Sequence, residues 1–222
     1  MIPAVWDHIV YRCIIGSRAY GLETEASDTD RRGFFLPPAD LFWSLDGVPE
    51  QIENDETQEC YWEVGKFLRL ALRANPQVLE CLNTRLVEHA TPLVQELLAM
   101  RAAFLSKELA RTCDAYALSQ FKKIEQDRRR GAIKWKHAMH LVRILLVGLR
   151  ALREGVYGIE VAEHRKRLLA IKRGETSWEE VARWQRELHD AYAPALRATP
   201  LPDAPDAKRV DDWLRRARRS AL

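Results

Sequence analysis

Two aspartates and a Gly-Ser pair near the N-terminus are the residues whose types and spacing best suit chemistry. Asp28 and Asp30 stand two positions apart, shortly after Gly16-Ser17. If residues 28–36 form a strand, both carboxylates point to the same face, because side chains alternate along a strand. A Gly-Ser loop adds backbone N–H groups and a hydroxyl. Together these groups could hold a divalent metal that carries a triphosphate.

The neighbouring sequence predicts a small part containing both helix and strands, which would position these residues. Three strands and a helix are expected, over residues 9–15, 28–36, 58–61 and about 62–73. The first strand is a continuous apolar run that leads into the Gly-Ser turn, so we expect it to be buried on both faces. The stretch 42–55 contains Gly47, Pro49 and many acidic residues, and it is expected to form a loop.

From Thr91 onward the pattern is helical almost throughout. Thr91-Pro92 fits an N-cap followed by proline, and Ser177 with Glu180 fits a capping box. We expect a linker near residues 194–207, where four prolines occur. The sequence therefore predicts an α+β protein with a mixed-sheet part over 1–90 and a helical domain over 91–222. The helices are expected at 92–102, 106–130, 132–154, 160–173, 177–193 and about 207–219.

Composition sets further bounds. The chain has 222 residues, 47% hydrophobic and 30% charged, which is ordinary for a soluble globular protein. No apolar run approaches the ~20 residues of a membrane span, and the N-terminus lacks the features of a signal peptide. The four scattered cysteines suggest reduced thiols and a cytoplasmic protein. The net charge is only +3, but residues 121–143 are strongly basic, which fits either a polyanion-binding surface or a solvated helix face.

Several segments resemble a known superfamily. Gly-Ser-Arg-x-Tyr-Gly-Leu at 16–22 and Ser-Asp-x-Asp-x-x-Gly at 27–33 are similar to the signature of the DNA polymerase β-like nucleotidyltransferases. Their local form resembles a bacterial and phage branch of which some members are associated with RNA repair. The segments 66–80 and 134–143 also resemble that branch, so the resemblance covers most of residues 8–175.

The resemblance implies a metal site that contains Asp28 and Asp30, with Mg²⁺ or Mn²⁺ as cofactor. Two metals about 3.5–4 Å apart would need bridging carboxylates. The alternative for the two aspartates is a structural turn. The superfamily usually supplies a third carboxylate from a neighbouring strand, and we select Glu59 because it falls within the third predicted strand. The other acidic residues of that region are Asp55, Glu56 and Glu63.

Other residues are expected to contact the nucleotide. Ser17, with the Gly16 backbone, would hold the β- and γ-phosphates, and Arg18 could add positive charge there. Tyr20 could stack on a base or sugar, with core packing as the alternative. Lys66, one helical turn before Arg69, could contact a phosphate or be a solvated helix charge.

A basic helical segment supplies the last candidates. His137 and His140 share a helix face with Lys136 nearby and Arg143 one turn further on. A zinc site there is disfavoured because no carboxylate stands at matching spacing in this helix. The resemblance implies that these four residues belong to the substrate site and contact nucleotide or acceptor phosphate. A buried histidine pair is the alternative.

These observations predict a metal-dependent nucleotidyltransferase that moves an NMP from an NTP to a hydroxyl acceptor and releases pyrophosphate. The basic helical half favours a nucleic-acid acceptor, with an RNA 3′ end preferred over DNA. One alternative is an enzyme that modifies a protein or a small molecule. Another is a domain that has lost catalysis and only binds nucleotide or RNA.

Overall fold

The computed structural model describes residues 5–25, 27–129, 131 and 133–222. The chain forms two compact units, which we call the sheet unit and the helical unit. The sheet unit contains the residues up to 19 together with 23–104 and 205–222, and the helical unit contains 20–22 and 105–204. Both the segment 91–104 and the C-terminal segment thus pack in the sheet unit, whereas the sequence pattern groups them with the helical half.

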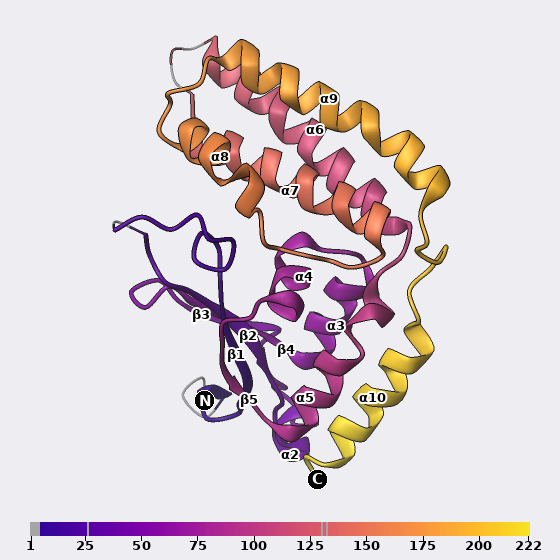
Figure 1. The fold of residues 1–222 in the computed structure, drawn as a ribbon. Helices are drawn as coiled ribbons and strands as arrows, with labels where there is room; N and C mark the ends of the chain where they lie inside the picture. Colours follow the sequence, from indigo (N-terminus) through magenta and orange to yellow (C-terminus); the bar gives the residue numbers. More distant parts are fainter. Residues whose placement is uncertain (1–4, 26, 130, 132) are drawn as a thin grey trace. The chain divides into compact units, whose positions relative to one another are not determined.

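The sheet unit is built on a mixed five-stranded sheet with the order β3-β4-β2-β1-β5 (Figure 1). The β2–β4 pair is parallel, and the other three pairs are antiparallel. This sheet, followed by a mostly helical half, confirms the predicted α+β class. The strands are β1 (Ile9–Ile15), β2 (Asp30–Phe35), β3 (Gln51–Asn54), β4 (Glu59–Glu63) and β5 (Val87–Ala90).

One face of the sheet carries the main core of this unit. Phe34 on β2 packs against Phe67, with ring centroids 4.7 Å apart, and meets the edge of Trp213 at 6.4 Å. Trp213 is 1% exposed, and its indole N–H donates to the Leu93 carbonyl, which joins the C-terminal helix to the helix that begins at Pro92. The helices of this unit are α2 (Ala39–Phe42), α3 (Val64–Leu72), α4 (Pro76–Asn83), α5 (Pro92–Ala99) and α10 (Ala207–Arg219), with a 3₁₀ turn at Arg101–Phe104.

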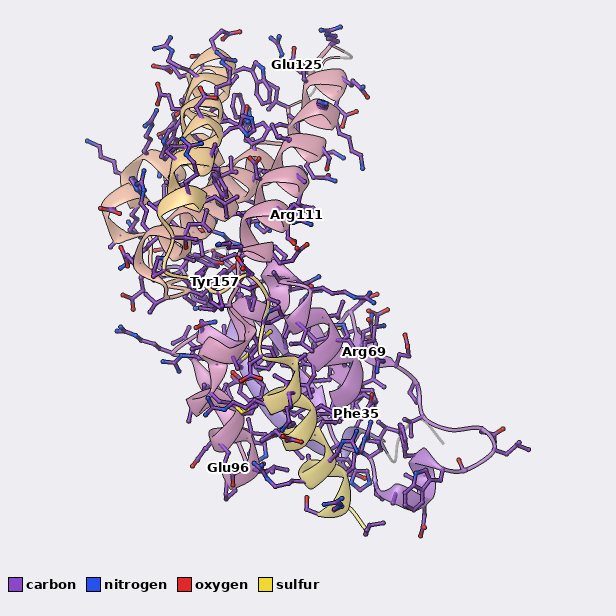
Figure 2. The ribbon with its side chains drawn as sticks, turned by 90° about the vertical axis from the view of Figure 1, so that its right-hand side faces the viewer. Phe35, Arg69, Glu96, Arg111, Glu125 and Tyr157 are labelled. Atoms are coloured by element: carbon purple, nitrogen blue, oxygen red, sulfur yellow. The ribbon has the colours of Figure 1, made fainter. Side chains whose placement is uncertain are left out.

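The opposite face of the sheet carries a smaller cluster. Phe35 and Tyr61 are fully buried there, together with Ile52 and Val5. Figure 2 labels Phe35 among the side chains of this unit. The two faces follow from the period of two along a strand, which sends Phe34 and Phe35 in opposite directions.

The helical unit packs α6 and α9 along α7 (Figure 1). Its core is aliphatic and aromatic, with Leu141, Leu145 and Val181 fully buried. The Tyr192 hydroxyl donates to the Leu145 carbonyl at 2.9 Å and joins α9 to α7. The α-helices of the unit are α6 (Glu108–Arg128), α7 (Trp135–Glu154), α8 (Arg165–Lys172) and α9 (Trp178–Ala198). No helix in the described part of the chain is long and apolar enough to cross a membrane.

Some local predictions are confirmed and others are wrong. The Thr91 N-cap and the Ser177 capping box are both present. The region 42–55 is not all loop, because β3 pairs there with β4, and β5 was not predicted at all. β1 is buried on one face only, in an alternating pattern. The helix expected at 177–193 continues to Ala198 through Pro194, so the predicted linker begins later.

Candidate active site at the Gly-Ser turn

The Gly-Ser turn and Asp30 meet at one end of the sheet. β1 ends at Ile15, which is paired with Asp30 at the start of the antiparallel strand β2. Gly16 follows with a φ of +75°, a backbone conformation that glycine adopts readily. A Cβ atom on Gly16 would lie 2.8 Å from Asp30 Oδ2, so the carboxylate occupies the space that a side chain would fill. The structure therefore brings together two of the predicted site residues.

Arg18 connects the turn to the segment that carries Asp28. Its guanidinium donates to the Ser27 carbonyl through Nη2 at 3.0 Å and to the Asp28 carbonyl through Nε at 3.4 Å. Asp28 is exposed and precedes β2, which begins at Asp30 rather than at the predicted residue 28. Arg18 thus holds the backbone beside Asp28, in addition to bringing a positive charge to the turn.

Glu59 lies on the other face of the sheet from Asp30. The parallel register pairs Glu59 with Arg31, so these two side chains point the same way, and Arg31 Nε lies 4.0 Å from Glu59 Oε1. Asp30 directly precedes Arg31 and therefore points to the opposite face. Arg31 also donates to Glu88 on β5, which raises the pKa of the arginine. The structure does not bring Glu59 together with Asp30. The register pairs Glu59 with Arg31, the residue after Asp30, and neighbouring residues of a strand point to opposite faces.

The other acidic residues proposed for the third carboxylate have separate surroundings. Glu63 caps α3, where its Oε2 accepts from the Gly65 and Lys66 amides, and its Oε1 is bonded to Arg218. Asp55 and Glu56 are exposed in the turn between β3 and β4. In the described part of the chain, no three His, Cys, Asp or Glu side chains are grouped to hold a metal ion.

Lys66 lies at the opposite end of the sheet from Asp30. β2 and β4 are parallel, Asp30 stands at the start of β2, and Lys66 follows the end of β4. At ~3.3 Å per residue, the five residues of β4 separate the two ends by about 13 Å or more. The Lys66 ammonium is 3.2 Å from Glu50 Oε2. The structure therefore does not bring Lys66 to the Gly-Ser turn.

Two residues at the turn were missed by the sequence reasoning. Glu80 on α4 is 4% exposed, and its Oε1 accepts the Gly16 N–H at 2.5 Å. The Gly16 amide, expected to donate to a phosphate, thus donates to a carboxylate. Arg32 shares the Asp30 face, with its Nη2 3.7 Å from Asp30 Oδ1. The only signal for Glu80 was its place in the segment Asn75-Pro76-Gln77-Val78-Leu79-Glu80, which carries part of the resemblance.

The remaining predicted residues belong to the helical unit. Tyr20 is 3% exposed, and the Arg143 guanidinium carbon lies 3.6 Å from the centroid of its ring. The next two residues are also held within this unit, because Arg165 donates to the Gly21 carbonyl at 2.7 Å and Lys172 to the Leu22 carbonyl at 3.4 Å. Stacking of Tyr20 on a base would require this buried pair to open.

The Lys136–Arg143 face of α7 divides into an exposed and a buried part. Lys136 is exposed, whereas Arg143 is 4% exposed and donates through Nη2 to His140 Nδ1 at 2.9 Å. Burial, reinforced by the charge of Arg143 and by His137, lowers the pKa of His140 to about 3. Burial and the nearby Lys134 and Lys123 also lower the pKa of His137. His140 is therefore neutral near pH 7 and carries no charge to offer a phosphate.

Comparison with known proteins gives a family and a relative of unassigned role. Residues 4–216 match the RNA repair pathway DNA polymerase beta family, RlaP, in agreement with the resemblance of the sequence motifs. The Bacillus subtilis (strain 168) protein YcgL, described as uncharacterized, is 35% identical over 82 residues. That match covers 36% of this chain and 32% of the length of the relative, and no solved structure matches. Because the family match covers almost the whole chain, the protein belongs to the RNA repair pathway DNA polymerase beta family, whose name implies a nucleotidyltransferase of the DNA polymerase β type.

Proposed function

We propose that the protein transfers a nucleoside monophosphate from an NTP to the 3′ hydroxyl of an RNA, with Mg²⁺ or Mn²⁺ as cofactor. The observation that carries the proposal is the Asp30 carboxylate lying against the bare Cα of Gly16, at the turn that begins the Gly-Ser motif. Metal-bound triphosphates are held by carboxylates together with backbone N–H groups, and this turn places both kinds of group side by side.

The donor chemistry of the turn fits Mg²⁺ or Mn²⁺. Mg²⁺ binds through oxygen atoms and is commonly held by one or two carboxylates together with substrate phosphates and water. Asp30 and Asp28 would supply these carboxylates, and the NTP would supply the phosphate oxygens. When bound, the cation neutralises developing charge on the phosphates. Glu59 is left out of the proposed set because it points to the other face of the sheet.

The chain itself would orient the triphosphate. The Ser17 hydroxyl and the amides after Gly16 would face the phosphates, while Arg18 keeps the Asp28 segment beside the turn. In the reaction a bond forms between the RNA 3′ oxygen and the α-phosphorus, and the bond from that phosphorus to pyrophosphate breaks. The hydroxyl proton passes to solvent, so the step balances without any further reactant.

A groove in the helical unit would bind the RNA acceptor. Residues of α6 and α9 line a groove of about 740 Å³ that contains five cationic side chains and two carboxylates. Both carboxylates, Glu125 and Glu179, pair with Arg128, with Nη2 and Nη1 of the arginine 3.0 and 3.7 Å from them. The net positive lining fits a phosphodiester backbone. The cationic residues are Lys122, Arg128, Arg129, Arg183 and Arg186.

The central experiment is primer extension with labelled NTPs. Purified protein is incubated with Mg²⁺ or Mn²⁺ and an RNA that ends in a 3′ hydroxyl, and with the same RNA ending in a 3′-deoxy nucleotide as control. We expect extension of the first RNA only. Asp30→Asn should reduce the rate by ~100-fold or more, because one charged ligand is lost. Asp46→Asn, an exposed loop aspartate, is the matched control and should retain activity.

Two further readouts test the separate parts of the proposal. Mn²⁺ binding, followed by electron paramagnetic resonance, should weaken in Asp30→Asn and not in Asp46→Asn. Replacing Arg183 and Arg186 by alanine should raise KM for RNA without changing KM for the NTP, whereas Arg111→Ala should not. Arg111 and Glu125 both lie on α6 (Figure 2), but only Glu125 lines the groove. Label found on protein instead of RNA, or NTP binding without any turnover, would overturn the proposed reaction.

A further inference from the structure

Glu80 is a buried carboxylate joined to the Gly-Ser turn. It lies on α4 with 4% of its surface exposed, and its Oε1 accepts the Gly16 N–H at 2.5 Å. Carboxylates are rarely buried to this extent, because burial removes the charge from water. A hydrogen bond from a backbone N–H to a carboxylate is charge-assisted and stronger than a neutral one. The hydrogen bond between Glu80 and Gly16 is therefore a specific, buried interaction of the turn.

Two other hydrogen bonds hold α4 and its C-cap residue, Thr84, against β1. The Tyr11 hydroxyl donates to the Cys81 carbonyl at 2.5 Å, and the Thr84 hydroxyl donates to the Ile14 carbonyl at 2.9 Å. The N-terminus of the helix is fixed by Asn75, whose side chain accepts from two amides of the first turn. α4 is thus attached to β1 by hydrogen bonds that do not involve the Glu80 side chain, whose Oε1 contacts the turn instead.

We propose that Glu80 is a positioning residue for the active-site turn, an inference that rests on the proposed transferase function. By accepting the Gly16 N–H, Glu80 fixes the orientation of the Ile15–Gly16 peptide, through which β1 enters the Gly-Ser turn. The same contact holds the bare Cα of Gly16 against the Asp30 carboxylate. Glu80 thus acts on the reaction through Gly16 and Asp30.

Three variants separate this role from other roles of the residue. Glu80→Gln keeps an oxygen acceptor of the same length, so kcat/KM should fall less than ~10-fold. Glu80→Ala removes the acceptor, and kcat should fall by ~100-fold through misplacement of the turn, with a smaller change in KM. Thr84→Val is the matched control, because it removes a different α4–β1 hydrogen bond. It should lower stability without lowering kcat.

The hydrogen bond can also be measured without any turnover. Gly16 is the only one of the ten glycines that follows an isoleucine, so ¹³C-carbonyl isoleucine with ¹⁵N-glycine labelling gives a single cross-peak for it. A short bond to a carboxylate should place the Gly16 amide proton far downfield. The signal should move upfield in Glu80→Ala, move less in Glu80→Gln and stay in place in Thr84→Val.

The outcomes decide the two proposals separately. An unchanged Gly16 signal in Glu80→Ala, or a loss of kcat no greater than in Thr84→Val, would overturn the positioning role. Should Glu80→Ala fail to fold, a Gly16 signal identical in Glu80→Gln and wild type, combined with a ~100-fold loss of kcat, would assign Glu80 a role through its charge and so refute positioning. If the wild type transfers to no acceptor, the proposed function fails, while the Gly16 signal still reports on Glu80.

Discussion

Gly16→Ala is the most direct perturbation of the candidate site. Gly16 has a φ of +75°, and a methyl group there would lie 2.8 Å from Asp30 Oδ2. The substitution therefore has two separable effects. It strains the backbone, since L residues, which carry a Cβ, disfavour positive φ, and it displaces the carboxylate that we assign to the metal.

The magnitudes of the two effects follow from the geometry. Positive φ costs about 1–2 kcal/mol for a residue with a Cβ. Ordinary contact begins at 3.4 Å, so Asp30 Oδ2 has to move by at least 0.6 Å, the difference between 3.4 and 2.8 Å. A misplacement of ~1 Å can reduce a rate by ~100-fold, so a reduction of about 10- to 100-fold in kcat/KM is expected.

Gly47→Ala is the control that isolates the displacement. Gly47 has a φ of +60°, with no atom within 4 Å of an added Cβ, so alanine there is strained but meets nothing. Urea unfolding should show that both variants lose about 1–2 kcal/mol or slightly more. In the primer-extension assay only Gly16→Ala should lose activity. Equal activities of the two variants would refute the assignment of Asp30 and the turn to the reacting centre.

Three other predictions concern stability and reactivity. Glu63→Ala removes the α3 N-cap and the partner of Arg218, and it should destabilise the protein by about 3 kcal/mol in urea unfolding while leaving transfer active. The folded pKa of His140, about 3, lies below its unfolded value near 6.5, so the unfolded chain binds more protons between these limits. Stability should therefore fall by up to about 1.4 kcal/mol per pH unit as the pH drops below 6.5, and His140→Gln should flatten that slope. Iodoacetamide should modify the cysteines only when the protein unfolds, as mass spectrometry would show. All four cysteines are buried, namely Cys13, Cys60, Cys81 and Cys113. Burial also raises the pKa of the Cys113 thiol to about 12.

Local chemistry made much of the architecture predictable. The apolar run before Gly16 is a property of a short segment, and the strands predicted over 9–15 and 28–36 are both present, the second from Asp30 onward. The Thr91 and Ser177 caps follow from side chains that bond to amides two or three residues away. The two weakest strands, β3 and β5, were missed because they are short and partly exposed, and their strand conformation comes from pairing with β4 and β1.

The sequence by itself was enough to predict that Gly16-Ser17 and the Asp28/Asp30 pair form one motif, because their spacing in the chain is the signal. Only the tertiary structure decided which other carboxylate joins them. Glu59 was a reasonable choice by position, but strand register turns it to the other face, and register depends on pairing between distant segments. Glu80 reaches Gly16 across 64 positions, because α4 is packed on β1. A contact of that kind arises from the packing of helix on sheet, and no local pattern of residues encodes it.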